Sequence, residues 1–186
     1  MGNKIKKFKG NSPIRGVAFL ILSVCFSYIT LTSPAIAKGE PNMNISSPEF
    51  NHNQSIPSKF TCEGKNINPA LIIDVLPKDA QSLALIVDDP DAPMGTWVHW
   101  VVFDIPLINK IDENSIPGKQ GITSSGKKDF HGPCPPSGTH RYFFKIYALD
   151  TKLNLKEGIS KKELEAAMQG HILDKAELIG LYKKIR

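Results

Sequence analysis

Between residues 43 and 182 the apolar positions mostly recur with the two-residue period of β-strands. Residues 83–87 are a continuous apolar run, which is typical of a strand covered on both faces. Residues 97–105 alternate between two apolar sets, and further runs lie at 43–47, 70–75, 142–149 and 176–182. Segments rich in Gly, Pro and Asp separate the runs, with no regular alternation of strands and helices. The pattern predicts an all-β dominated domain, built as an antiparallel β-sandwich.

One helix stands out from this pattern. Ser160 and Glu163 have the spacing of a capping box, in which each side chain binds the backbone N–H of the other residue. Leu164 and Met168 then lie on one helical face, and Gly170 follows as a terminator. We therefore expect the sandwich to have one or two short peripheral helices.

The N-terminal segment has the order of a signal peptide. A lysine-rich start is followed by an apolar run at 16–31 and by Ala35-Ile36-Ala37, a small-x-small cleavage site. The alternative is an uncleaved membrane anchor, but the run falls short of the ~20 residues that a spanning helix needs. We expect residues 1–37 to be removed and residues 38–186 to form one exported domain, periplasmic or secreted.

The net positive charge of the chain comes from this segment. The chain has 23 basic and 18 acidic residues, a net charge of +5, and residues 1–37 contain no acid. The five basic residues there are Lys4, Lys6, Lys7, Lys9 and Arg15. Residues 38–186 therefore contain equal numbers of acids and bases. This balance argues against nucleic acid as a partner and against stable membrane anchoring after cleavage.

Cys62 and Cys134 are the only cysteines in residues 38–186. An even number in an exported protein allows one disulfide, and two buried free thiols are the alternative. No pair of cysteines or Cys/His cluster has the spacing of a zinc site, so we expect no metal and no cofactor.

The residues that could bind a ligand or take part in catalysis lie in two turn-rich segments, 88–93 and 132–142, and in the strand between them. His99 should share a strand face with Trp97, Val101 and Phe103 by the two-residue period, as His140 should with Tyr142. Side chains from different strand ends, together with Asp89, can converge on one pocket. Imidazole N–H, phenol O–H and backbone N–H groups suit an oxyanion such as a phosphate monoester.

Less specific interpretations of these residues remain open. The acidic segment 88–93 is also compatible with a solvated turn, and a histidine among apolar neighbours with a hydrogen-bonded core residue. Asp89, His99 and His140 could instead be metal ligands. A Ser-His-Asp hydrolase is the other enzymatic interpretation, but the sequence has no nucleophile-elbow motif.

The two segments resemble the two signatures of the phosphatidylethanolamine-binding protein family, in its bacterial YbhB/YbcL-like branch of Raf kinase inhibitor-like proteins. Residues 89–93 with 97–100 match the first signature, and residues 132–136 with 138–142 match the second. Residues 60–66 resemble an early segment of that branch. The resemblance implies a β-sandwich and, between residues 92 and 93, a cis peptide bond. It also makes a homodimer a reasonable expectation.

The resemblance further implies an anion pocket. Its lining residues would be Asp89, His99, Gly132, His140 and Tyr142. We expect an exported, non-catalytic protein that binds a small phosphorylated or carboxylated ligand, or a phosphorylated partner. An inhibitor or modulator acting through the pocket rim is the alternative, and a hydrolase with a His/Asp pair is a weaker one. A carboxylate beside His99 or His140 should raise the pKa of that histidine.

Overall fold

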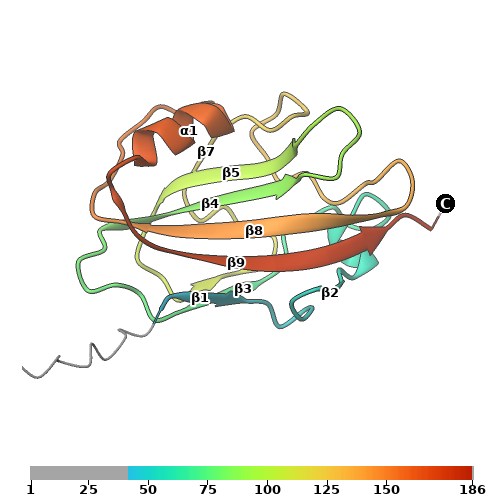
Figure 1. The fold of residues 1–186 in the computed structure, drawn as a ribbon, viewed down its shortest axis with the longest axis horizontal. Coiled ribbons are helices and arrows are strands. Elements are labelled where there is room, and N and C mark those ends of the chain that lie inside the picture. The colour runs from blue at the N-terminus through green and yellow to red at the C-terminus, as the bar shows by residue number, and fades with distance from the viewer. Residues whose placement is uncertain (1–41, 186) are drawn as a thin grey trace, which may run out of the picture. The chain divides into compact units, whose positions relative to one another are not determined.

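The computed structural model describes residues 42–185, which fold as two β-sheets and one α-helix (Figure 1). The expected signal peptide, residues 1–37, lies outside the described residues. No helix within residues 42–185 is long and apolar enough to cross a bilayer. The prediction of a β-sandwich with short peripheral helices is confirmed.

The larger sheet has six strands and the smaller sheet has three. In chain order the elements are β1 (Asn44–Ser46), β2 (Gln54–Ser55), the 3-10 turn η1 (Ser58–Phe60), β3 (Leu71–Asp74), β4 (Ser82–Asp89), β5 (Trp97–Ile105), β6 (Lys110–Ile111), β7 (Lys119–Gln120), β8 (Thr139–Leu149), α1 (Lys161–Met168) and β9 (Ile172–Lys183). The strand orders are β1-β3-β6 and β2-β9-β8-β4-β5-β7. Strand β2 runs parallel to β9 and the other pairs are antiparallel, so the expectation of purely antiparallel pairing is wrong at this one edge.

The larger sheet is covered on both faces. One face packs against the smaller sheet, where Ile45 and Ile73 share a buried cluster with Leu85. On the opposite face, Leu164 and Met168 of α1 are buried against β4 and β5 (Figure 1). Because β4 lies between these layers, all eight of its residues are buried, as its continuous apolar run predicts.

Helix α1 begins with the predicted capping box. The Ser160 hydroxyl accepts a hydrogen bond from the Glu163 N–H at 3.2 Å, and the Glu163 carboxylate accepts from the Ser160 N–H at 2.7 Å. Gly170 follows the helix with φ of +79°, a conformation that glycine adopts without a steric penalty.

Strand β5 contains a β-bulge at His99. Trp100 pairs with Val87 and Val98 with Asp88, so two adjacent positions of β4 face three positions of β5. His99 is the extra residue in this register. A bulge of this kind interrupts the alternation of side chains along the strand.

The bulge changes which residues share a face with His99. Its ring contacts Tyr142, which belongs to the core between the sheets, whereas Val101 and Phe103 are buried on the face that α1 covers. The predicted common face with Val101 and Phe103 is therefore wrong, and the cause is the extra residue. Trp97 and His99 do line the same cavity, described below.

The last two residues of β4 are carboxylates that use opposite faces of the sheet. Asp88 has a side chain that is 1% exposed, and its carboxylate accepts from Lys145 at 2.8 Å and from Lys161 at 2.5 Å. Lys161 is the first residue of α1, so this ion pair fixes the helix to the central strand. Asp89 serves the cavity on the other face.

We predict that Asp88→Asn lowers the free energy of unfolding by about 1.5–3 kcal/mol, since hydrogen bonds to a buried charged group are lost. Urea unfolding measures this change. Asp112→Asn is the control, because Asp112 is 71% exposed and pairs with Lys110 at the surface. Such pairs contribute at most about 1 kcal/mol. Equal losses in the two variants would show that the Asp88 contacts are no stronger than a surface pair.

Candidate functional site

A cavity of about 640 Å³ lies where β4 ends and where β5 and β8 begin. This volume is within the range of small-molecule sites. Four of the five expected pocket residues line it: Asp89, His99, His140 and Tyr142. The fifth, Gly132, does not belong to the lining.

Asp89 orients His140. The Asp89 Oδ2 atom lies 2.7 Å from His140 Nδ1, and the two side chains are 4% and 9% exposed. The other carboxylate oxygen accepts the backbone N–H of Asp91 at 2.8 Å. Since Nδ1 donates to the carboxylate, Nε2 is the ring nitrogen that His140 can offer to a molecule in the cavity.

His99 is held differently. Its Nδ1 donates to the backbone carbonyl of His131, and its side chain is almost fully buried. Burial lowers the pKa of His99 to about 4 and outweighs both the hydrogen bond to His131 and the field of Asp89, which act in the opposite direction. The expected rise in pKa concerned the histidine beside the carboxylate, and Asp89 contacts His140 rather than His99. For His99 the effect of burial outweighs that of the carboxylate. At neutral pH the ring of His99 is uncharged, and its Nε2 is a hydrogen-bond acceptor.

Tyr142 places a free hydroxyl in the cavity. Its ring meets the ring of His99 edge to face, with centroids 5.1 Å apart. Within residues 42–185 its hydroxyl oxygen is the only buried side-chain nitrogen or oxygen that forms no hydrogen bond. Burial raises the pKa of Tyr142, with a further contribution from Asp89, so the phenol keeps its proton. The backbone of Cys134 lies beside the hydroxyl and slightly favours its ionised form, but no hydrogen bond of ordinary geometry joins them.

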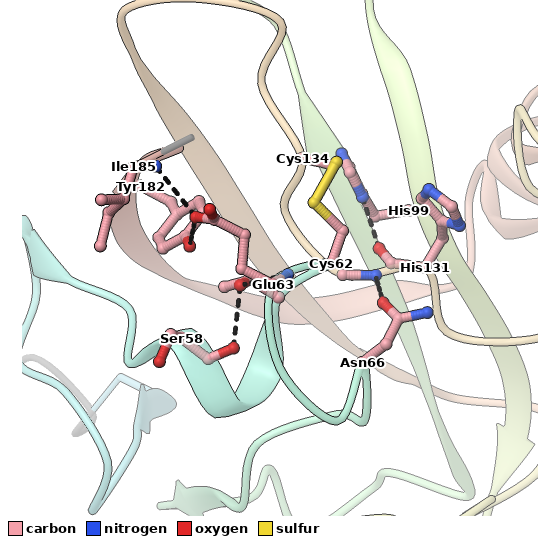
Figure 2. The surroundings of a disulfide bond; sticks show 11 residues. Ser58, Cys62, Glu63, Asn66, His99, His131, Cys134, Tyr182 and Ile185 are labelled. Carbon is pink, nitrogen blue, oxygen red and sulfur yellow. Dashed lines mark hydrogen bonds between the residues drawn. A yellow bond between two sulfur atoms is a disulfide. The ribbon is translucent and has the colours of Figure 1, made fainter.

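Gly132 has a structural role rather than the expected place in the lining. Its backbone N–H donates to Asn66 Oδ1 at 2.7 Å, so this amide cannot also donate to a molecule in the cavity (Figure 2). A Cβ atom at Gly132 would lie 2.5 Å from the Phe60 carbonyl oxygen. Glycine is therefore required here because two backbone segments pack closely.

A disulfide joins Cys62 to Cys134, with Cα atoms 5.4 Å apart (Figure 2). Of the two arrangements that the sequence left open, the structure has the bridge. The Cys62 N–H also donates to the Pro133 carbonyl at 3.1 Å. Cys134 also lines the cavity, although the sequence predicted only a disulfide for this residue.

The segment that contains Cys62 also holds the end of β9. The Glu63 carboxylate accepts hydrogen bonds from the Tyr182 hydroxyl and from the Ile185 N–H (Figure 2). Tyr182 pairs with His140 across the sheet. One short segment therefore supports both the cavity loop and the strand beside His140.

The loop after β4 is fixed by an ion pair. Arg141 donates to the two carboxylate oxygens of Asp91 at 2.9 Å and 2.7 Å, which lowers the pKa of Asp91 to about 2. Within the described residues every peptide bond is trans. The cis bond expected between Ala92 and Pro93 is therefore wrong.

The exposed part of the cavity lining is apolar. Met94 is fully exposed and Trp97 is 38% exposed, and Pro135 and Pro136 also belong to the lining. His131 also lines the cavity, with its ring centroid 6.4 Å from that of Trp97. Neither signature includes His131, although this residue stands directly before the second one.

Asp89, His99 and His140 are not arranged as metal ligands. In the part of the chain that the structure describes, no group of three or more His, Cys, Asp or Glu side chains could hold a metal ion. The Asp89 carboxylate is instead occupied by His140 and by the Asp91 N–H.

The sequence is similar to known proteins over most of its length. A family model described as phosphatidylethanolamine-binding protein matches residues 46–183. A UPF0098 protein of Methanothermobacter thermautotrophicus is 49% identical over 150 residues, which are 76% of this chain and 99% of the relative. The UPF0098 protein PH1269 of Pyrococcus horikoshii is 46% identical over 178 residues, 89% of each chain.

Two solved structures share the fold. CT736 from Chlamydia trachomatis, a phosphatidylethanolamine-binding protein homologue, is 40% identical with a TM-score of 0.75. The alignment covers 77% of this chain and 98% of CT736. Escherichia coli YbcL is described as a new member of the mammalian phosphatidylethanolamine-binding protein family. It is 27% identical with a TM-score of 0.72, over 77% of this chain and 99% of YbcL.

The neutral state of His99 predicts a loss of stability in acid. The native ring stays unprotonated down to a pKa of about 4, while the unfolded ring takes up its proton near 6.5. The unfolded state therefore binds more protons between these values, and stability falls by up to about 3 kcal/mol as the pH drops from 6.5 to 4. The free energies of unfolding of the parent and of His99→Gln, measured against pH, should therefore diverge by this amount between pH 6.5 and 4. Parallel curves would show that native His99 titrates normally.

The disulfide predicts a stability difference that depends on loop length. It closes 72 positions of sequence, which corresponds to about 4 kcal/mol in the chain-entropy account. We expect Cys62→Ser with Cys134→Ser to lose about this amount in urea unfolding, in a Cys25→Ser background that excludes other thiol pairs. Reductant should destabilise the parent similarly and leave the double variant unchanged. A parent that is insensitive to reductant under denaturing conditions would contradict the bridge.

Proposed function

Because the chain belongs to the phosphatidylethanolamine-binding protein family, we propose that it is a small-ligand-binding protein whose cavity holds an oxyanion, such as a phosphate or carboxylate group. The observation that supports this most strongly is the buried Tyr142 hydroxyl, which has no partner in the protein. An unsatisfied buried hydroxyl costs about 1–3 kcal/mol, and a ligand oxygen that accepts its proton removes that cost.

Two further groups complete the set of donors. The Cys134 backbone lies beside the Tyr142 hydroxyl, and both residues line the cavity. His140 donates from Nε2 when its ring is an imidazolium, with the opposite nitrogen held by Asp89. Binding of an anion therefore favours the protonated ring of His140 over the neutral ring.

The arrangement favours binding over hydrolysis. A nucleophile for covalent catalysis would need a hydrogen bond to a histidine base. Within residues 42–185 no Ser or Thr hydroxyl and no thiol forms such a bond with His99 or His140. Ser124 lines the cavity, but its hydroxyl accepts the Val98 N–H at 2.8 Å. Cys134 is in the disulfide.

The apolar mouth supports a second candidate function, modulation of a partner protein through the pocket rim. Met94 is fully exposed on a loop that the Asp91–Arg141 ion pair stiffens, and Trp97 lies at the same mouth. An exposed methionine beside a tryptophan is typical of contact surfaces. In this candidate the oxyanion is presented by the partner, as a phosphorylated or acidic side chain.

We further propose that the protein is exported and that Lys38 is the first residue of the mature chain. The disulfide supports this, since such bridges persist in oxidising compartments. The intact mass of protein recovered from the exported fraction tests the proposal. It should correspond to residues 38–186, and a mass that includes residues 1–37 would contradict cleavage.

We predict that His140→Gln and Tyr142→Phe each weaken the binding of inorganic phosphate or sulfate by about ten- to a hundredfold, because one hydrogen bond to a charged group is lost. Titration calorimetry measures the effect. Tyr147→Phe is the matched control, since Tyr147 packs on the helix-covered face of β8, away from the cavity. It should bind like the parent. If all three variants bind like the parent, the oxyanion site lies elsewhere.

A further inference from the structure

We propose that the cavity selects singly charged oxyanions over doubly charged oxyanions of the same shape, and that Asp89 is the residue that excludes the second charge. This inference rests on the proposed function, because it requires an oxyanion in the cavity. It concerns a property that oxyanion binding alone does not imply, since many phosphate sites hold the dianion with Arg or Lys side chains.

The cavity contains no permanent cation. Within residues 42–185 its lining includes neither Lys nor Arg. Arg141 follows His140 directly, but its Nε and Nη2 donate to the Asp91 carboxylate at the surface. Lys145 and Lys161 bind Asp88 on the opposite face of β4.

The cavity does contain a fixed negative charge. The Asp89 side chain is 4% exposed, and its position is set by His140 and by the Asp91 N–H. A proton on the His140 ring adds one positive charge, which Asp89 cancels. His99 adds none, because it is neutral, and His131 contributes only when it is protonated. The protonated pair is nearly neutral and can hold one ligand charge through hydrogen bonds, whereas a second ligand charge would be buried near Asp89 with no lysine or arginine among the described lining residues to balance it.

The hydrogen-bonding capacity of His99 leads to the same selection. Its Nδ1 donates to the His131 carbonyl, so Nε2 offers a lone pair toward the cavity. A tetrahedral oxyanion whose oxygens are all ionised and unesterified, such as sulfate, presents an acceptor oxygen in every direction and would oppose this lone pair. A ligand with one protonated or esterified oxygen avoids the conflict, and a P–OH group can donate to it.

These features define the chemical class of ligand. It includes carboxylates, phosphodiesters, sulfate esters and phosphate monoesters that keep one proton. It excludes sulfate and fully ionised phosphate monoesters as tight ligands.

The test compares three tetrahedral anions of known charge at pH 7 and constant ionic strength. Sulfate is a dianion, while sulfamate and methyl sulfate are monoanions with polar and apolar substituents. We expect both monoanions to bind the parent protein at least tenfold more tightly than sulfate. If both monoanions gain affinity over sulfate, the cause is their lower charge, since only one of them has an apolar substituent that could contact the apolar mouth.

Two variants assign the selection to its residue. In Asp89→Asn the ratio of sulfamate to sulfate affinity should fall toward one. Asp150→Asn removes a negative charge just beyond the far end of β8 and should leave the ratio unchanged. An Asp89→Asn variant that keeps the tenfold ratio, or that binds neither anion, contradicts the assignment to Asp89.

The outcomes separate this inference from the proposed function. If the parent binds sulfate as tightly as sulfamate and His140→Gln weakens both, the oxyanion site stands and the charge selection is overturned. If the parent binds none of the three anions, both are overturned.

Discussion

The central strand β4 has no exposed residue, yet it ends in two adjacent carboxylates. In a strand that is buried on both faces, neighbouring side chains point in opposite directions, so Asp88 and Asp89 must each find a separate partner. Asp88 binds two lysines, one of them the first residue of α1, and this contact fixes the third layer of the fold. Asp89 binds only an imidazole and a backbone N–H. On the Asp88 face the lysines hold the fold together. On the Asp89 face there is no lysine or arginine among the described residues of the cavity lining.

The second constraint is the segment of residues 58–66, which joins the parts of the site that strands do not connect. It is tied to the cavity loop by the disulfide and by Asn66, and to the end of β9 by Glu63 (Figure 2). With the loop fixed in this way, the Cys134 backbone is held beside the Tyr142 hydroxyl. A site whose donors are already placed loses little entropy when it binds a small anion.

Much of this structure could be predicted from the sequence. The bounds of β5 and the capping box of α1 follow from local pattern, because side-chain alternation and helix capping are local properties. The signatures also predicted that Asp89, His99, His140 and Tyr142 line one cavity, as they do. The bulge at His99 could not be predicted, since it depends on the register between strands. Nor could the role of Gly132, because its neighbour Asn66 lies 66 positions away. The low pKa of His99 results from burial, and the degree of burial cannot be predicted from the spacing of residues in the sequence.

The central claim is that the cavity holds an oxyanion through a protonated His140 while His99 remains neutral. Nitrogen NMR of ¹⁵N-histidine-labelled protein at pH 7, titrated with sulfamate, tests it directly. The account predicts that at saturation both nitrogens of His140 are protonated, and that His99 keeps its single proton on Nδ1. His52 and His171 do not line the cavity, and their signals should not move. A saturated complex in which the His140 signals are unchanged, or in which His99 takes up the proton, would contradict the account.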